Sequence, residues 1–143
     1  MEEKVVRARD DGSLELHARD ATVHGTTLRY EPPANKNTLG YWTRKEDWAS
    51  WELDLGKPGI FRVDITQGCG KGSGGADVEF ALDGQQPILI SVQDTGGFQN
   101  WITRTIGEYT IDNAGRHTIS VRPQSKPGAA VMDLRAITLT PKQ

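Results

Sequence analysis

Residues 94–121, DTGGFQNWITRTIGEYTIDNAGRHTISV, carry the strongest fold signal in this chain. The run Asp94-Thr-Gly-Gly97 predicts a tight turn, because glycine adopts positive φ angles without a steric penalty. Residues 98–110 are rich in β-branched and aromatic side chains, which favour strands. After a second turn at 112–115, polar and apolar side chains alternate, and this period of two is typical of a strand with one solvated and one buried face. The stretch therefore predicts two strands and their turns.

The same alternation recurs along the rest of the chain. Residues 51–55 and 61–65 alternate on either side of a Gly-Lys-Pro-Gly turn, which predicts an antiparallel hairpin. Further strands are expected at 14–18, 26–30, 78–82, 88–92 and 131–139. Long helical patterns are missing from the sequence. We therefore predict an all-β fold, a two-sheet antiparallel β-sandwich (jelly roll) of about nine strands with no substantial helix.

Length and charge limit the domain organisation and the partners. The chain has 143 residues, which is enough for one buried core and leaves little room for a second. We expect an N-terminal extension at 1–13, which is charged and turn-rich, and a β-sandwich domain at 14–141. A formal net charge of −2 provides no basic field for phosphate backbones or anionic lipids, and no apolar run approaches the roughly 20 residues that span a bilayer. We therefore expect no nucleic acid and no membrane as partners.

Three further sequence features limit the function classes. Cys69 is the only cysteine, so the chain forms no internal disulfide and no thiolate metal cage. The first four residues lack the basic-then-apolar pattern of a signal peptide. The segment Gly70-x-Gly72-x-x-Gly75 has the form of a dinucleotide fingerprint, but residues 77–82 predict a strand instead of the helix that would receive a pyrophosphate. We therefore predict that this glycine segment is a loop between strands.

Aromatic side chains occur near the predicted loops and strand ends. Trp51 has the same parity as Leu53 and Leu55, so we assign it to the core. Trp42 ends a Pro/Asn-rich segment and Trp101 has the parity opposite to the isoleucines that follow it, so no apolar stripe requires either indole. An exposed indole stacks well on the apolar C–H face of a pyranose, while amides and guanidinium groups satisfy the hydroxyls. This pattern favours an oligo- or polysaccharide as partner.

Several motifs stand in an order known from one group of domains. Thr95-Gly-Gly-Phe98 precedes Trp101, and Ala114-Gly-Arg-His-Thr118 forms the next predicted strand. Upstream and downstream are Trp48-Ala-Ser-Trp51, Pro58-Gly-Ile-Phe61 and Met132-Asp-Leu134. This order resembles family 6 carbohydrate-binding modules and their relatives, which have a galactose-binding-like jelly roll. Such modules are appended to secreted glycosidases, including α-L-fucosidases, and to sulfatases.

The resemblance implies a sugar site in the loops at one end of the sandwich. Related modules use one aromatic residue from an early loop, one from the Thr-Gly-Gly-aromatic region and an asparagine shortly before the last strand. The first corresponds to Tyr41 or Trp42 and the second to Trp101, with Phe98 as the alternative. Val131 stands where the asparagine is expected, so the site is either degenerate or supplied with polar contacts by other side chains. The candidates for these contacts are Asn37, Arg44 and Asn100.

The resemblance also implies a structural calcium, held in many relatives by carboxylates of the first and last strands. Asp133 corresponds to the last-strand ligand. His17-Ala-Arg19 stands where Glu-Ala-Glu is usual, and an arginine cannot bind a hard cation that takes about six to eight oxygens. Glu15 and Asp20 flank this position and leave a shifted site open. We favour loss of the ion and expect no cofactor.

The sequence contains no enzyme signature. The three histidines lie in separate segments without metal-ligand spacing. A glycosidase pair could be assembled from Glu46, Asp47, Asp54 or Asp64, but the sequence gives no geometry with which to choose two of them. A cleft with two facing carboxylates, or one strongly perturbed carboxyl group, would indicate a small hydrolase instead. We expect no catalytic residues and no metal ligands.

These observations predict a non-catalytic carbohydrate-binding module that targets a parent glycoside hydrolase or sulfatase to its glycan. Its partners would be an oligo- or polysaccharide and a catalytic domain of the same chain. The alternative is a non-binding structural β-sandwich that packs against a neighbouring catalytic domain. As part of a secreted parent protein, the module is expected in the extracellular space or the periplasm.

Overall fold

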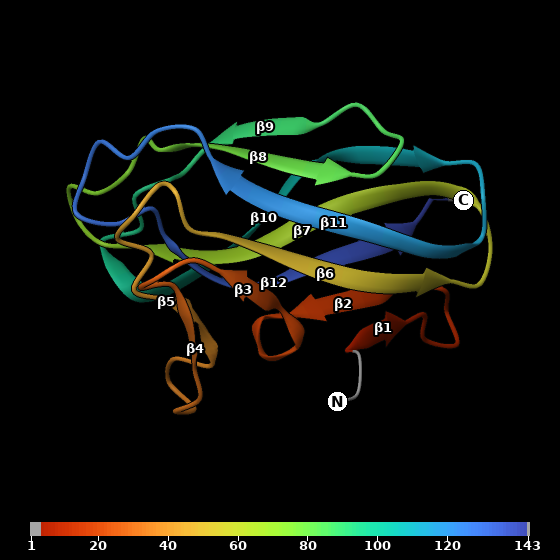
Figure 1. Cartoon of the computed structure of the whole chain (residues 1–143), viewed down its shortest axis with the longest axis horizontal. Coiled ribbons are helices and arrows are strands. Elements are labelled where there is room, and N and C mark those ends of the chain that lie inside the picture. Colours follow the sequence, from red (N-terminus) through yellow and green to blue (C-terminus); the bar gives the residue numbers. More distant parts are fainter. Residues whose placement is uncertain (1–3, 143) are drawn as a thin grey trace.

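The computed structural model describes residues 4–142, which form two β-sheets packed face to face (Figure 1). The first sheet contains, in spatial order, β1 (Val5–Arg7), β6 (Trp48–Leu55), β11 (Gly115–Pro123), β8 (Asp77–Leu82) and β9 (Ile88–Ser91), with β3 (Thr22–His24) also paired to β6. The second contains β10 (Gly97–Ile111), β7 (Gly59–Cys69), β12 (Asp133–Pro141), β5 (Thr38–Gly40) and β4 (Arg29–Glu31), with β2 (Leu14–His17) also paired to β12. All pairs are antiparallel except β1 with β6. The predicted two-sheet antiparallel sandwich is confirmed. The hairpin predicted for residues 51–55 and 61–65 is wrong, because β6 and β7 belong to different sheets and the Gly-Lys-Pro-Gly turn carries the chain from one sheet to the other.

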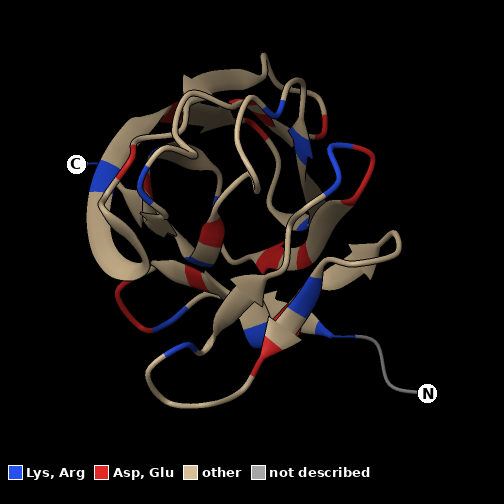
Figure 2. Ribbon diagram, turned by 90° about the vertical axis from the view of Figure 1, so that its left-hand side faces the viewer, with Lys and Arg blue, Asp and Glu red and all other residues tan. Residues whose placement is uncertain are grey.

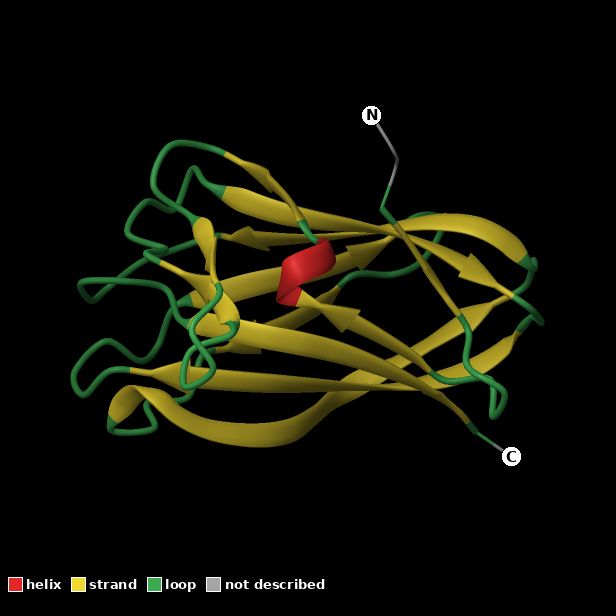
Figure 3. Cartoon of the chain, turned by 90° about the horizontal axis from the view of Figure 1, so that it is seen from below, coloured by secondary structure: helices red, strands yellow, loops and turns green. Residues whose placement is uncertain are grey.

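The number of strands and the N-terminal segment differ in detail from the prediction. The described residues contain twelve strands, because several three-residue strands also pair. One of these, β1, lies inside the segment expected as an extension and pairs with β6; residues 1–3 of that segment lie outside the described residues. The one helical segment in this part of the chain is the 3-10 turn η1 (Ala18–Asp20), drawn red in Figure 3. No helix found between residues 4 and 142 is long and apolar enough to cross a membrane.

Apolar side chains of both sheets meet between the layers, as the alternation predicts. Trp51 is 1% exposed, which confirms its assignment to the core, and its Nε1 donates to the His17 carbonyl at 2.8 Å. The Tyr109 hydroxyl donates to the Phe80 carbonyl at 2.6 Å. Both large rings therefore contribute buried area without leaving a polar atom unpaired.

The pair β10–β7 contains the irregularity that positions the candidate site. Gly97 pairs with Cys69, but the next ladder pair begins at Ile102, so residues 98–101 bulge out of the regular register. Gly68 permits this close approach, because a Cβ at that position would overlap the Phe98 carbonyl oxygen. Bulges near a sheet edge redirect side chains. The segment that follows the Thr-Gly-Gly turn therefore faces the end of the sandwich.

Four connecting loops gather at this end, on the left in Figure 1 and facing the viewer in Figure 2. They are residues 41–47, 70–76, 92–96 and 124–132. The glycine segment is one of them and leads directly into β8, which confirms it as a loop between strands. Acidic and basic residues are interspersed on this face, so it carries no block of one charge (Figure 2).

Candidate functional site

A cavity of about 280 Å³ opens among the loops at this end of the sandwich. Its lining comes from β4, from the loops on either side of β5, from the start of β10 and from the segment around the start of β12. The lining residues are Glu31, Lys36, Tyr41, Thr43, Phe98, Gln99, Ala129, Ala130 and Asp133. The cavity thus combines two aromatic rings with a few convergent polar groups, which is the usual composition of a small-ligand site.

Tyr41 is the most exposed aromatic side chain of this cavity. It is 47% exposed and has a φ of 54°, a left-handed conformation that is uncommon for a residue with a bulky side chain. The Arg29 guanidinium carbon lies 3.9 Å from the centroid of its ring, a cation–π contact that holds the ring in place. Positive φ at a non-glycine residue is a form of backbone strain that clusters at ligand sites.

Phe98 forms the second aromatic surface. It is half-buried and lies on the bulged segment of β10, and its ring packs against Gly70, where a Cβ would overlap the ring. Phe98, the alternative of the two aromatics expected from the Thr-Gly-Gly region, therefore lines the cavity and Trp101 does not.

The polar groups of the cavity include two carboxylates and one ammonium group. Lys36 Nζ lies 3.1 Å from Glu31 Oε2, and Gln99 Nε2 donates to Asp133 Oδ2 at 3.1 Å. Asp133 is 4% exposed, and burial, reinforced by the charge of Glu31 and opposed by the hydrogen bond from Gln99, raises its pKa to about 7. The hydrogen bond and charge of Glu31 raise the pKa of Lys36. The cavity therefore holds one stable ion pair and one carboxyl group that titrates near neutral pH.

Trp42 was predicted to be exposed in the loop, and this prediction is wrong. Its side chain does not line the cavity. It is completely buried: its Nε1 donates to the Asp47 carbonyl at 2.8 Å and its carbonyl accepts from Val131 N at 2.8 Å. Tyr41, in its left-handed conformation, is 47% exposed, whereas the ring of the next residue, Trp42, is buried. Trp42 therefore supports the loop from below, and Tyr41 presents its ring to solvent.

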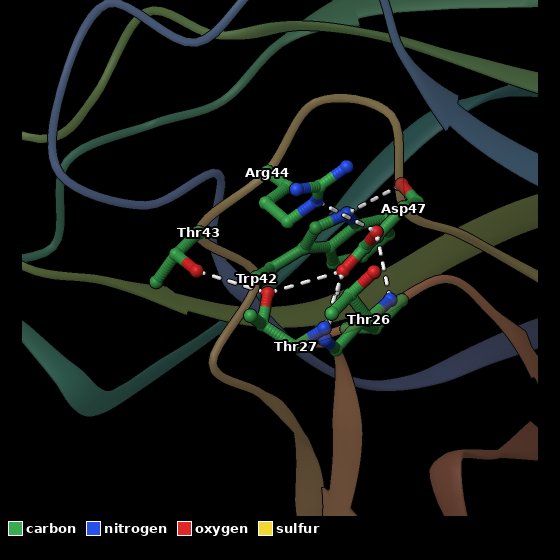
Figure 4. Close-up of polar contacts among 7 residues, drawn as sticks. Thr26, Thr27, Trp42, Thr43, Arg44 and Asp47 are labelled. Atoms are coloured by element: carbon green, nitrogen blue, oxygen red, sulfur yellow. Dashed lines mark hydrogen bonds and ion pairs between the residues drawn. The ribbon is translucent and has the colours of Figure 1, made fainter.

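Asp47 connects two loops by a dense set of hydrogen bonds (Figure 4). Its carboxylate accepts from the backbone N–H groups of Thr26, Thr27 and Leu28 at 3.1, 2.8 and 3.0 Å, and from the Thr27 hydroxyl at 3.0 Å. Burial acts to raise its pKa, but these hydrogen bonds outweigh burial and lower the pKa to about 2. Asp47 thereby fixes the loop 41–47 that carries Tyr41.

Arg44 belongs to the same cluster and is not part of the cavity lining. Its Nε lies 3.4 Å from Asp47 Oδ1, as Figure 4 shows. Gly25 is required beneath this carboxylate, since a Cβ there would overlap it. The guanidinium group expected to contact a sugar is thus engaged in an internal ion pair.

Trp101 and the expected asparagines support neighbouring loops. The Arg135 guanidinium carbon lies 3.9 Å from the Trp101 ring centroid, and Arg135 Nη2 donates to the Lys36 carbonyl at 2.8 Å. Asn37 Oδ1 accepts from the Tyr30 hydroxyl at 2.5 Å, and Asn100 Nδ2 donates to the Thr95 carbonyl at 3.2 Å. None of the three expected side chains lines the cavity.

Sequence reasoning missed Glu31, Lys36 and Gln99 and assigned Asp133 a different role. Glu31 and Lys36 flank the Pro/Asn turn between β4 and β5, and Gln99 directly follows Phe98. The bulge after Gly97 places Gln99 next to Asp133. No pattern in the sequence predicts that bulge. The sequence signal that could have pointed to Gln99 is that it directly follows Phe98, the aromatic residue of the Thr-Gly-Gly-aromatic motif.

The carboxylates considered for calcium do not fit such a site. Glu15 lies 3.6 Å from Arg9, and Asp20 lies 4.0 Å from Arg19. Asp133 lies in the cavity with Gln99. Among residues 4–142, no three His, Cys, Asp or Glu side chains converge where a metal could bind. We derive no role for calcium from these residues.

Asp133 supplies the strongly perturbed carboxyl group that would be expected of a small hydrolase, since burial raises its pKa to about 7. Glu31 lies beside it against Gly40 in the wall of the same cavity. Of the carboxylates considered from the sequence, Asp47, Asp54 and Asp64 are engaged in ion pairs with Arg44, Arg7 and Arg62. The fold and this end-loop cavity define a ligand-binding β-sandwich.

Comparison with known proteins identifies the family of this chain. The sequence model described as "Carbohydrate binding module (family 35)" matches residues 26–127, and the chain belongs to this family. The sequence is 29% identical over 90 residues to β-agarase AgaA of Microbulbifer thermotolerans. That match covers 62% of the chain and 20% of the agarase, so the chain spans about a fifth of this relative.

Solved structures show the same fold. The C-terminal family 6 module of a laminarinase from Zobellia galactanivorans has a TM-score of 0.70 at 19% identity, with 90% of this chain and 98% of that one covered. A family 35 module of Clostridium thermocellum has a TM-score of 0.69 at 12% identity, covering 91% and 98%. A β-(1,4)-mannanase of Podospora anserina with a family 35 module has a TM-score of 0.68 at 17% identity, covering 93% of this chain and 28% of the enzyme.

The expected resemblance is therefore confirmed, since family 6 and family 35 modules share this jelly roll. The chain is a non-catalytic carbohydrate-binding module, and it is similar in part to a glycoside hydrolase.

Proposed function

We propose that the cavity bounded by Tyr41 and Phe98 is the carbohydrate-binding site of this module. The observation that carries the proposal is the placement of two aromatic rings beside polar side chains in one cavity. The rings provide apolar surface for the C–H face of a sugar, and the carboxylates, amide and ammonium group of the cavity provide partners for its hydroxyls. A single shallow site of this kind binds weakly, on the order of micromolar to millimolar.

We further propose that the module holds an attached polysaccharide-degrading enzyme on its substrate. This is supported by the agarase and the mannanase, in which the matching region is a small part of a longer enzyme. Tethering converts weak binding into a high local concentration of substrate around the catalytic domain. The parent would be a secreted glycoside hydrolase or sulfatase, which places the module outside the cell or in the periplasm.

The alternative, a sandwich that only packs against a catalytic domain, finds no support in exposed apolar surface. In the described part of the chain the exposed large hydrophobic residues are Tyr41, Ile60 and Leu89. They lie in a loop of the site, on β7 and on β9, respectively, and β7 and β9 belong to different sheets.

Binding to an array of plant, algal and animal glycans, followed by NMR titration of each hit, tests the proposal. Tyr41→Ala should weaken binding at least tenfold, because it removes one aromatic wall. Leu89→Ala truncates another exposed large side chain, on β9, and should leave affinity unchanged. Full binding by both Tyr41→Ala and Phe98→Ala variants would exclude this cavity, and a silent array with folded protein would favour the packing module.

A further inference from the structure

We infer that the cavity selects uncharged sugars and discriminates against uronic acids and sulfated sugars, an inference that rests on the proposed function of the same cavity. Two acidic side chains, Glu31 and Asp133, contribute to its wall. Lys36 is the only basic residue of the lining, and its ammonium group is already paired with Glu31 at 3.1 Å. An anionic sugar would therefore meet two carboxyl groups and no unpaired cation of the lining.

Gly40 explains how two carboxyl groups share this wall. A Cβ on Gly40 would overlap Glu31 Oε1 and would lie 3.4 Å from Asp133 Oδ1, so both oxygens face the same bare stretch of backbone. Gly40 ends β5 and is itself buried. The missing side chain therefore creates the space in which the two oxygens approach each other.

These two oxygens are available to a ligand. The internal donors reach the other oxygen of each group: Lys36 contacts Glu31 Oε2 and Gln99 contacts Asp133 Oδ2. Within the described residues no fully buried side-chain oxygen lacks a partner. Glu31 Oε1 and Asp133 Oδ1 receive no hydrogen bond from residues 4–142, so neither oxygen is fully buried, and both residues line the cavity.

Carboxylate oxygens without an internal partner bind hydrogen-bond donors of a ligand. A sugar hydroxyl donates to a carboxylate in a short, charge-assisted hydrogen bond. A uronate or a sulfate ester has no proton to donate from its charged group at neutral pH, and it is repelled by a carboxylate a few ångströms away. Arg29 does not compensate, because it lies over the Tyr41 ring and does not line the cavity. A cavity of about 280 Å³ is small for a ligand site, so we expect it to hold about one sugar ring.

Matched pairs of methyl glycosides test the inference by NMR titration at pH 8. The pairs are galactose with galacturonate, glucose with glucuronate and mannose with mannuronate, which differ only at C6. We expect the neutral member of any pair that binds to bind at least tenfold more tightly. Raising NaCl from 50 to 500 mM should strengthen binding of the uronate and leave the neutral sugar unchanged, because salt screens the repulsion.

Glu31→Gln tests the cause of the selectivity. It keeps the shape of the side chain, removes one negative charge and leaves Lys36 without its partner, so we expect the preference for the neutral sugar to fall at least fivefold. Glu108→Gln breaks the ion pair with Lys142 in the part of β10 that lies beyond the cavity residues Phe98 and Gln99. It makes the same chemical change and should keep the preference of the wild type.

The outcomes separate this inference from the function on which it rests. Equal or tighter binding of uronates, with binding still lost in Tyr41→Ala, would overturn the selectivity and retain the site. Binding of no sugar of either class by folded protein would overturn both. If Glu31→Gln does not fold, the salt dependence of the wild type still decides the question.

Discussion

Replacing Asp133 by asparagine should stabilise this protein at alkaline pH. Asp133 is buried with a pKa of about 7, against an ordinary value of 3.8. Between these two values the folded chain binds more protons than the unfolded chain, so the free energy of unfolding decreases as pH rises through this window. One pKa unit corresponds to about 1.4 kcal/mol, so the cost above pH 7 is at most roughly 4 kcal/mol.

Asparagine fits the same position without this cost. Its oxygen can accept the hydrogen bond that Gln99 now donates to Asp133 Oδ2, and its amide can donate toward Glu31 Oε1, which lies on the same side of Gly40. Because the variant does not titrate at this position, the difference in stability between variant and wild type isolates Asp133. We expect this difference to widen by roughly 2–3 kcal/mol between pH 5 and pH 8.

Urea unfolding at pH 5, 6, 7 and 8, followed by tryptophan fluorescence, measures this difference directly. Asp112→Asn changes the same functional group at an exposed turn position and reports the effect of a lost charge alone. A difference in stability that does not vary with pH, or an Asp133→Asn variant that is less stable than wild type at pH 8, would refute the argument that the buried carboxyl group is destabilising.

Two further variants probe the surroundings of the cavity. Asp47→Asn should lower the free energy of unfolding by about 2 kcal/mol at pH 7, because the folded-state pKa of about 2 lies below the ordinary value of 3.8. This stabilisation is present above pH 4 and is lost as pH falls through 2, so at pH 2.5 the difference between variant and wild type in urea unfolding should be reduced to about a third of its value at pH 7; an equal loss at both pH values would contradict it. Gly40→Ala should displace Glu31 and weaken glycan binding at least tenfold while costing about 1–3 kcal/mol of stability. NMR titration and thermal unfolding check this, with Gly56→Ala, an exposed position with open space around it, as control, and unchanged binding would contradict it.

The sequence was sufficient to predict the sandwich, because strand alternation and glycine turns are local signals. The core position of Trp51 follows directly from parity. Parity does not identify the partner of a strand, and β7 pairs with β10 and β12 instead of with β6. The short strands β1, β3 and β5 escaped prediction, since three residues are too few to establish a period.

The site was predictable only in part, because its geometry depends on backbone irregularities. Parity could not decide between Tyr41 and Trp42, and the decision is made by the positive φ of Tyr41 and the internal hydrogen bond of Trp42. The bulge at residues 98–101 brings Phe98 and Gln99 to the cavity and leaves Trp101 outside it. Such bulges depend on which strand a segment pairs with, and that pairing is a tertiary property.

Asp47 and Asp133 show why one buried carboxylate supports the fold and the other suits a ligand. Both are almost fully buried, yet their pKa values move in opposite directions. Asp47 accepts from three backbone N–H groups and a hydroxyl. Within the described residues 4–142, Asp133 accepts only from Gln99, and it lies near the charge of Glu31. The acceptor capacity that the protein leaves unused at Asp133 is what a sugar hydroxyl would fill. Ligand binding at this position should therefore lower the pKa of Asp133 and recover part of the stability that its burial costs.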